Sequence, residues 1–201
     1  MDNIKQEILK TAANAFFKNG IRSVSVDDIC DELRISKKTF YSYFRQKEEL
    51  VMAVLGFFTR NHQENECKVE EREFANVVDK VLWMRQVTIS GLQEKKHERF
   101  FNDLFKYYPV VYDSFVKERH QFMEQLFLSQ LEEGINQGFF REDINRDYLA
   151  KSLTVSLQYF IDLSIKHPRK HNKNVIVDFM VDIYLRIVCN GKGLDYYLAN
   201  V

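Results

Sequence analysis

The chain has 201 residues, with 29 basic and 29 acidic side chains and 45% hydrophobic residues, enough for one large domain or two small ones with a buried core. No stretch approaches eighteen consecutive apolar residues, and charges interrupt the N-terminal segment, which argues against a transmembrane helix and a secretory signal. The three cysteines, Cys30, Cys67 and Cys189, lie far apart and outside any paired motif, which indicates a reducing, cytoplasmic setting in which they serve as small hydrophobic residues.

The scarcity of helix-breaking residues predicts an all-α fold. The chain contains two prolines and seven glycines, and no run alternates apolar and polar residues as a half-buried strand does. The first helix is expected over residues 4–18, where apolar residues recur at three- and four-residue spacing and Asn19-Gly20 supplies an end.

Two serine caps predict the next two helices. Ser25, followed three residues later by Asp28, forms a capping-box pattern at the start of a short second helix. Ser36 is expected to cap a third helix over residues 37–44, and a fourth begins near Lys47. Three short helices, the second and third joined by a three-residue turn, form a helix-turn-helix unit.

The third helix has two different faces. At about 100° per residue, Phe40 and Phe44 fall on one side and can pack into a core, whereas Lys38, Ser42 and Arg45 point the opposite way. Hydroxyls on its flanks and lysine ammoniums are the donors that bind phosphate oxygens. Residues 34–47 carry five cations and no acid, although the whole chain is neutral. The pattern favours a focused DNA-binding surface; an ordinary helical bundle with a solvated basic face is the alternative.

Residues 8–50 read ILKTAANAFFKNGIRSVSVDDICDELRISKKTFYSYFRQKEEL and resemble the TetR/AcrR family of bacterial repressors. The segment GINQGFFREDI, residues 134–144, is similar to a common stretch of the family's C-terminal domain. The resemblance implies an N-terminal helix-turn-helix DNA-binding domain, residues 1–46, and a larger C-terminal helical ligand-binding and dimerisation domain, residues 47–201.

The resemblance also implies roles for individual residues. Thr39, Tyr43 and Lys47 match positions that hold DNA phosphates in the family, and three other residues of the third helix fall where bases are read. The base-reading residues are Lys38, Tyr41 and Ser42. With the caps and neighbouring cations included, the expected DNA-binding residues are Ser25, Arg34, Ser36, Lys37, Lys38, Thr39, Tyr41, Ser42, Tyr43, Arg45 and Lys47.

Three positions depart from the family pattern. Arg34 occupies the turn where the family usually has glycine, so it is either a tolerated backbone strain of about 1 kcal/mol or an extra phosphate contact. Gln46 is a poorer helix cap than serine or asparagine. Val26 and Asp27 stand where some relatives present polar or basic DNA contacts, so the second helix is expected to contribute little to recognition.

The remaining chain is expected to form a long fourth helix, from residue 47 to about 68, and five more helices. Glycines and prolines separate these five, at residues 73–92, 97–107, 110–137, 146–165 and 174–188. The last two are apolar over far more than one stripe, which predicts burial on both sides. One side belongs to the protomer core, and the other is expected to form a two-fold homodimer as a four-helix bundle. The interface residues are predicted to be Leu153, Leu157, Phe160, Ile161, Phe179, Ile183 and Ile187.

Aromatic residues concentrate in the larger domain. Residues 51–201 hold 22 of the 28 aromatic side chains, and such a set can form core packing or line an apolar cavity. In the family such a cavity binds an inducer that releases the operator, so a small lipophilic or aromatic ligand is expected. The residues predicted to contact it are Phe58, Trp83, Phe101, Phe105, Tyr108, Tyr112, Phe122 and Tyr159.

The sequence contains none of the common catalytic, metal-binding or phosphate-loop motifs, so no enzyme, metal site or cofactor is expected. Two functions remain. The first is a transcriptional regulator that binds a pseudo-palindromic double-stranded operator, responds to an inducer and acts away from membranes. The second is a helical module of the same fold that acts through protein partners.

Overall fold

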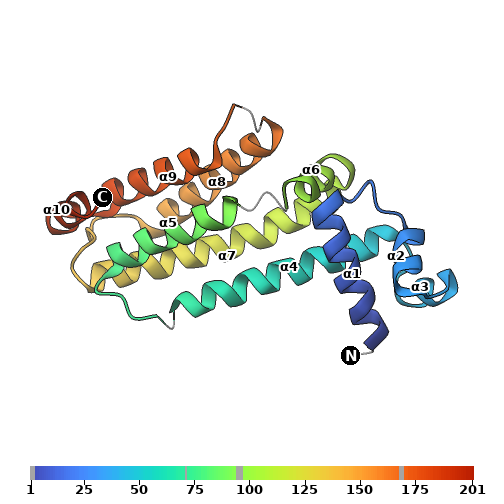
Figure 1. Ribbon diagram of the computed structural model, residues 1–201. Helices are drawn as coiled ribbons and strands as arrows, with labels where there is room; N and C mark the ends of the chain where they lie inside the picture. The colour runs from blue at the N-terminus through green and yellow to red at the C-terminus, as the bar shows by residue number, and fades with distance from the viewer. Residues whose placement is uncertain (1–2, 71, 94–96, 168–169) are drawn as a thin grey trace. The chain divides into compact units, whose positions relative to one another are not determined.

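The computed structural model describes residues 3–70, 72–93, 97–167 and 170–201 (Figure 1). Over these residues the regular structure is helical, apart from one isolated bridge between Phe140 and Cys189, so the expected all-α class is confirmed. Among the described helices, none has the length and apolar character needed to cross a membrane.

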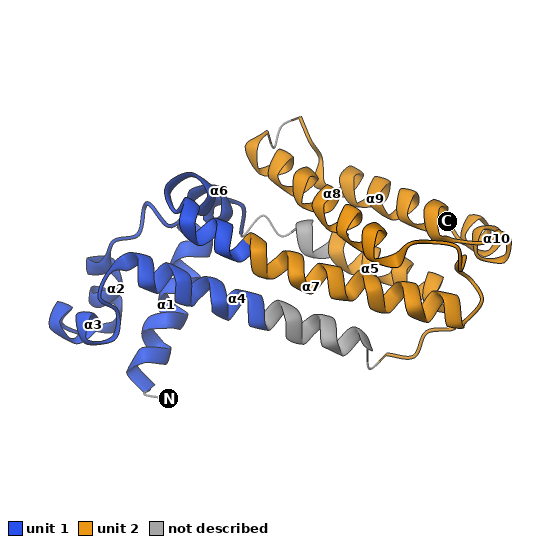
Figure 2. Cartoon of the chain, turned by 180° about the vertical axis from the view of Figure 1, so that it is seen from behind, with its two compact units in different colours: residues 1–71, 95–115 blue, residues 72–94, 116–201 orange. Residues whose placement is uncertain are grey.

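The chain divides into two compact units (Figure 2). Unit 1 comprises residues 1–71 and 95–115, and unit 2 comprises residues 72–94 and 116–201. This division differs from the boundary expected at residue 46. The difference arises because α6 (Glu98–Tyr107) packs against α1 (Asn3–Asn19) and so joins the N-terminal helices.

Unit 1 contains the expected helix-turn-helix. After α1, it is built from α2 (Val26–Leu33) and α3 (Lys37–Tyr43), followed by α4 (Lys47–Glu70). The start of α7 (Pro109–Asn136) also belongs to this unit. The capping box is present as expected: the Asp28 backbone N–H donates to Ser25 Oγ at 3.1 Å, and the Ser25 N–H donates to the Asp28 carboxylate at 2.7 Å.

The turn after α1 is held by two other helices of unit 1, α6 and α4. Gly20 has a φ of +88°, and a Cβ there would lie 2.7 Å from Asp103 Oδ2 of α6. That carboxylate oxygen accepts the Arg22 backbone N–H at 2.8 Å, and the Arg22 guanidinium donates to the Tyr107 hydroxyl at 2.8 Å. Lys47, the first residue of α4, donates to the Ile21 carbonyl. The turn therefore requires glycine and fixes where α2 begins.

Unit 2 is built from α5 (Val77–Gln93), the remainder of α7, α8 (Arg146–Lys166), α9 (Lys173–Val188) and α10 (Gly191–Ala199). Helix α5 begins at Val77, later than the sequence indicates, because the Asn76 side chain accepts the Val78 and Asp79 N–H groups. Helix α10 was not expected from the sequence. Asn190 caps it by accepting the Gly193 N–H at 3.0 Å.

Helix α5 lies against α9 and α10, and polar side chains tie these helices together around an apolar core. Tyr196 donates its hydroxyl proton to Asp79 at 2.9 Å, and Arg85 forms an ion pair with Asp178 at 2.7 Å. The core itself is made by Val77, Val78, Val81, Leu131, Phe140, Leu153, Tyr184, Leu185, Val188, Cys189 and Tyr197.

Two of the three cysteines are buried free thiols. Cys30 lies in the core of unit 1 and Cys189 in the core of unit 2, as expected for cysteines used as small hydrophobic residues. The side chain of Cys67 lies outside the described part of the chain.

Replacement of Gly134 by alanine is expected to destabilise unit 2. A Cβ at this position would lie 2.1 Å from the buried ring of Phe140, and overpacking of this kind costs about 1–3 kcal/mol. Thermal unfolding followed by circular dichroism should show a lower Tm for Gly134→Ala. Gly191→Ala is the matched control, because a Cβ there meets nothing within 4 Å. Equal Tm values for the two variants would contradict the packing argument.

Candidate functional site

Helix α3 is anchored by its apolar face. The Phe40 and Phe44 side chains are buried in unit 1, with their ring centroids 5.9 Å apart. Ser36 caps the helix by accepting the Thr39 N–H at 3.0 Å. The opposite face is exposed, as expected, and Tyr41 retains 49% of its accessible surface. The anchored helix thus presents a fixed set of side chains to solvent.

Arg34 ends α2 in a left-handed backbone conformation. Its φ and ψ angles are 54° and 40°, and its N–H donates to the Asp31 carbonyl at 3.2 Å. Among the described non-glycine residues, Arg34 alone has a positive φ. A side chain in this conformation costs about 1–2 kcal/mol. The turn therefore favours glycine, although the sequence supplies a cation.

Several predicted DNA-binding hydroxyls are used inside the helix-turn-helix. Ser25 and Ser36 are both helix caps. Thr39 Oγ1 lies 2.9 Å from Ser36 Oγ, and the Ser42 hydroxyl donates to the Thr39 carbonyl at 2.6 Å. Tyr43 is half-buried. The hydroxyls of Ser25, Ser36, Thr39 and Ser42 therefore help to hold α2 and α3 in place.

Two of the predicted cations already have partners. Lys47 is half-buried and donates to the Ile21 carbonyl, and burial lowers the pKa of its ammonium group. Lys37 Nζ lies 2.8 Å from Asp27 Oδ1, and the hydrogen bond to this carboxylate raises the pKa of Lys37. These partners come from segments that precede α3 in the sequence, and neither pairing was expected.

Three other cations are free for a ligand. Within the described residues, the side chains of Arg34, Lys38 and Arg45 form no hydrogen bond or ion pair, and all three are exposed. Lys38 and Tyr41 are three residues apart on α3, which places them on the same side of the helix, and Arg45 follows shortly after its end. Together with Arg34 they form a cationic and aromatic surface, called here the α3 surface.

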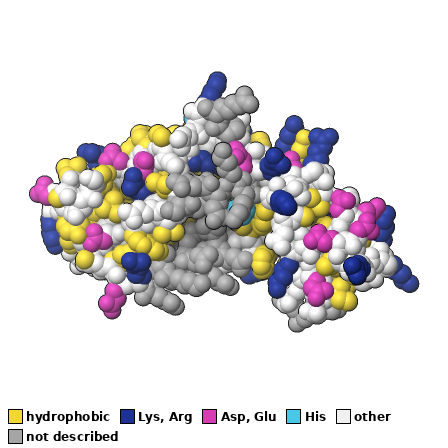
Figure 3. Space-filling view, viewed as in Figure 1, with side chains coloured by type: hydrophobic (Ala, Val, Ile, Leu, Met, Phe, Trp, Pro, Cys, Tyr) yellow, Lys and Arg dark blue, Asp and Glu magenta, His cyan; other side chains and the backbone are white. Residues whose placement is uncertain are grey.

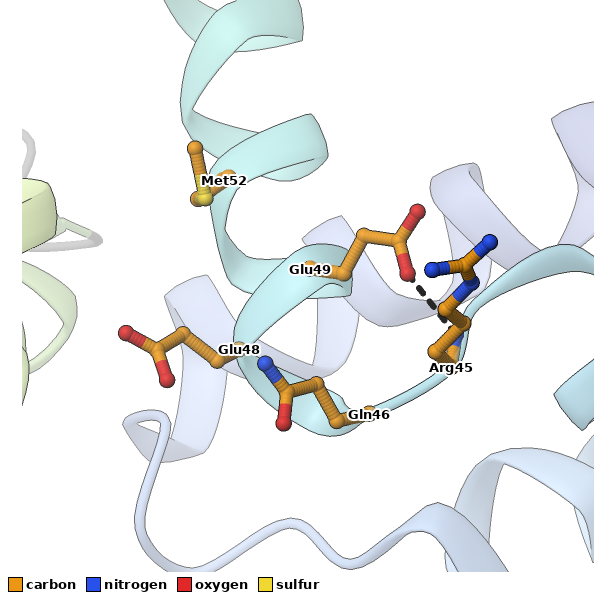
Figure 4. Close-up of a pocket in the computed structure, with 5 residues that line it drawn as sticks. All are labelled: Arg45, Gln46, Glu48, Glu49 and Met52. Atoms are coloured by element: carbon orange, nitrogen blue, oxygen red, sulfur yellow. Dashed lines mark hydrogen bonds between the residues drawn. The ribbon is translucent and has the colours of Figure 1, made fainter.

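An open hollow of about 560 Å³ lies where α3 leads into α4 (Figure 4). Its lining combines Arg45 with two carboxylates, Glu48 and Glu49, as well as Gln46 and Met52. The Glu49 carboxylate reaches back to accept the Arg45 N–H at 2.8 Å, which stabilises the start of α4 where Gln46 is a poor cap. The hollow is therefore the open corner between the end of α3 and the start of α4.

Charges of both signs are interspersed over unit 1. On the face shown in Figure 3, Lys and Arg side chains alternate with Asp and Glu side chains in the right-hand part, which is unit 1. This arrangement agrees with the net charge of zero for the whole chain. Any polyanion that binds this unit would therefore meet a few placed cations and not a general positive charge.

The aromatic residues predicted to contact a ligand divide between the two units. Phe58, Phe101, Phe105, Tyr108 and Tyr112 belong to unit 1, whereas Trp83, Phe122 and Tyr159 belong to unit 2. Many of them pack on other rings: Phe101 contacts Phe58, Phe100 and Phe115, and Phe105 contacts Tyr112. Tyr159 lies on an outward face of α8 with 60% of its surface exposed. A shared lining role for the eight residues stays a prediction.

Sequence reasoning missed three buried polar atoms in unit 2. His120 Nε2, Thr154 Oγ1 and the Tyr184 hydroxyl are buried and have no hydrogen-bond partner. A buried polar atom without a partner costs about 1–3 kcal/mol, so such groups are uncommon. Lys151 and Glu124 approach within 4.0 Å, and Thr154 and His120 lie about one turn further along these two antiparallel helices. No sequence pattern marks these residues.

The outward faces of α8 and α9 carry exposed apolar side chains. On α9, Val175, Phe179 and Ile187 are exposed and recur at multiples of four, with half-buried Ile183 between them. Leu153, by contrast, is 5% exposed and belongs to the core of unit 2, so its predicted place in an interface is corrected. The predicted residues Leu157, Phe160 and Ile161 are half-buried, and their role in an interface stays a prediction. Val155, Tyr159 and Val175 are also exposed apolar residues of these two helices.

In the part of the chain that the structure describes, no group of three or more His, Cys, Asp or Glu side chains is arranged to hold a metal ion.

Comparisons with known proteins agree with this geometry. Residues 8–54 match the model of the bacterial regulatory proteins, tetR family. The chain is 28% identical over 178 residues to the uncharacterized HTH-type transcriptional regulator YvaF of Bacillus subtilis, covering 86% of this chain and 90% of YvaF. It is 24% identical over 162 residues to the HTH-type transcriptional repressor KstR2 of Mycobacterium tuberculosis, covering 77% and 80%.

The solved structures show the same fold. A transcriptional regulator from Cytophaga hutchinsonii matches with a TM-score of 0.77 and 16% identity, covering 94% of this chain and all of the other. The structure of KstR2, described as a ketosteroid transcriptional regulator, matches with a TM-score of 0.55 and 18% identity, covering 94% and 97%.

Replacement of Arg34 by glycine should stabilise unit 1. Glycine adopts the left-handed conformation without a Cβ clash, so Arg34→Gly is expected to be about 1 kcal/mol more stable than Arg34→Ala. Both variants remove the guanidinium, so comparing them isolates the backbone effect. Urea unfolding monitored by circular dichroism measures the difference. Equal midpoints would show that the backbone at Arg34 is unstrained.

Proposed function

Because this chain belongs to the TetR family of bacterial regulatory proteins, we propose that it is a dimeric repressor whose operator is released by a small lipophilic or aromatic inducer. The observation that carries the DNA-binding part is the α3 surface: Arg34, Lys38 and Arg45 are exposed cations without partners among the described residues, beside exposed Tyr41. A helix anchored by Phe40 can present them as one rigid set.

The residues of the α3 surface are proposed to have two different roles in DNA recognition. Lys38, in the first turn of α3, and Tyr41, one turn later, are exposed where a helix in the major groove can meet base edges, and a lysine ammonium can donate to guanine O6 or N7. Arg34 and Arg45 flank the helix and are placed to contact phosphates, which fix register without reading sequence. Thr39, Ser42 and Lys47 support this arrangement through their internal hydrogen bonds.

Selection of duplexes from a random pool with the purified full chain tests the proposal. Enriched sequences should be pseudo-palindromic, with half-sites about 34–36 Å apart or a multiple of that distance. The selected duplex also provides the assay in which lipophilic and aromatic compounds are screened for release. If no duplex binds above the non-specific level at physiological salt, the repressor function is wrong and the alternative of a protein-interaction module gains support.

Lys38→Ala should weaken binding to the selected duplex more than to a random one. Loss of a base contact costs about 1–3 kcal/mol and relaxes the preference at that base pair. Fluorescence anisotropy with labelled duplexes measures both affinities. Lys117→Ala, an exposed lysine of α7 in unit 2, is the matched control and should bind like the wild type. An unchanged affinity of Lys38→Ala would exclude Lys38 from base reading.

We infer the dimer from the apolar faces of α8 and α9 in unit 2. Val155 and Tyr159 are exposed one turn apart on α8, and Val175 and Phe179 are exposed one turn apart on α9. The Phe160 and Phe179 rings lie 5.8 Å apart, so the two faces are adjacent. Contiguous exposed apolar surface of this kind is typical of an interface, and a two-fold pairing would bury it in a four-helix bundle.

Phe179→Glu should convert the dimer to a monomer. A carboxylate in the centre of the apolar interface would be desolvated without a partner. Sedimentation velocity at micromolar concentration measures the change. Val87→Glu is the control, because Val87 is also an exposed apolar residue of unit 2 but lies on α5. A wild-type chain that sediments as a monomer would contradict the proposed dimer.

The inducer is proposed to bind in unit 2. The buried atoms His120 Nε2, Thr154 Oγ1 and the Tyr184 hydroxyl support this, because a ligand with polar groups would give them partners. Such surroundings suit a mainly apolar ligand that carries one or more hydrogen-bonding groups.

A further inference from the structure

Asp27 and Lys37 form an ion pair between the first turns of α2 and α3. Lys37 Nζ lies 2.8 Å from Asp27 Oδ1, and both side chains are more than half exposed. Lys37 is next to Lys38 in the sequence, and the pair therefore forms at the edge of the α3 surface. An acid at this edge is unexpected for a surface that binds a polyanion.

The Asp27 carboxylate has no role in capping α2. The cap is made by its neighbour Asp28, which accepts the Ser25 N–H at 2.7 Å and the Ser25 hydroxyl at 2.8 Å. Among the described residues, the one hydrogen-bonding or ionic partner of the Asp27 side chain is Lys37. The helix dipole favours an acid in the first turn of α2, but neither the dipole nor the cap requires that this acid pair with a cation of α3.

The pair competes with a phosphate for the same ammonium group. An exposed ion pair is weak, so a DNA phosphate can displace Asp27 from Lys37. The displacement, however, breaks the ion pair, and the energy of the pair is then lost from the energy of DNA binding. Lys37 then contributes less to DNA binding than an unpaired lysine such as Lys38.

We propose that Asp27 limits the affinity of the chain for DNA by holding Lys37 in this ion pair, an inference that rests on the proposed DNA-binding function. Because a phosphate contact carries no sequence information, the limit applies to operator and random duplexes alike. Random sites vastly outnumber an operator in a genome, so a weaker phosphate contact leaves more of the protein free.

A double-mutant cycle tests this inference in the full chain. Asp27→Asn keeps the shape of the side chain and frees Lys37, so it should bind a random duplex about tenfold more tightly in 50 mM salt. One additional released counterion makes the slope of log K against log salt concentration steeper by about 0.9. The gain in affinity should therefore fall to about threefold in 200 mM salt. Anisotropy titrations over this salt range measure both effects.

The second arm of the cycle removes Lys37. In the wild-type background, Lys37→Gln should weaken binding less than about twofold, because the pair already occupies the lysine. In the Asp27→Asn background, Lys37→Gln should abolish the whole gain in affinity for the random duplex. If the gain persists in the double variant, Asp27 acts by direct repulsion of DNA and the inference is wrong. It is equally wrong if Asp27→Asn binds no more tightly than the wild type.

Glu32→Gln is the matched charge control. Glu32 is an exposed acid on the same helix, and it forms no ion pair among the described residues. This variant changes the net charge by the same amount as Asp27→Asn. Its affinity should stay within about twofold of the wild type, and an equal gain would attribute the effect to net charge.

Heparin, a polyanion other than DNA, tests the role of the ion pair independently of the proposed DNA-binding function. On a heparin column, Asp27→Asn should elute at higher salt than the wild type, whereas Asp27→Asn/Lys37→Gln should elute with Lys37→Gln. If no duplex binds the wild type but this order holds, the repressor function fails and the role of the ion pair stands. If duplexes bind but the variants elute together and bind equally, the inference alone fails.

Discussion

The turn between α1 and α2 is the constraint on which the arrangement of unit 1 depends. Asp103 of α6 accepts the Arg22 N–H, and Lys47 of α4 donates to the Ile21 carbonyl, so two helices distant in sequence hold the two sides of one peptide group. Gly20 makes the close approach of Asp103 possible. Because α2 begins a few residues later, the same bonds set the direction of α2 and, through the buried face of α3, the orientation of the cations beyond it.

This constraint changes how the basic residues are understood. Three lysines that the sequence does not distinguish differ in the partners of their ammonium groups. Lys47 donates to a backbone carbonyl, Lys37 forms an ion pair, and Lys38 is free among the described residues. Only the folded chain makes the distinction, since each partner comes from a different helix or turn. A neutral protein can therefore bind a polyanion, provided that its unpaired cations lie on one rigid face.

Sequence patterns predicted the features that depend on residues three or four positions apart. The capping box at Ser25, the cap at Ser36 and the inward faces of Phe40 and Phe44 follow from spacings of three and four residues. The bonds of Asp103 and Lys47 join residues 26 or more positions apart, and no local spacing indicates them. The cap of α5 at Asn76 and the cap of α10 at Asn190 were missed. A single asparagine is common in loops as well as at helix caps, so by itself it does not indicate where a helix begins.

The two buried thiols have a chemical consequence. Burial raises the pKa of Cys189 to about 11, and burial together with nearby carboxylates raises the pKa of Cys30. The thiolate is the reactive form of cysteine, and a raised pKa makes the thiolate of Cys189 scarce at neutral pH. Oxidants and electrophiles therefore react slowly at both positions. The cores of unit 1 and unit 2 keep their packing under conditions that modify exposed thiols.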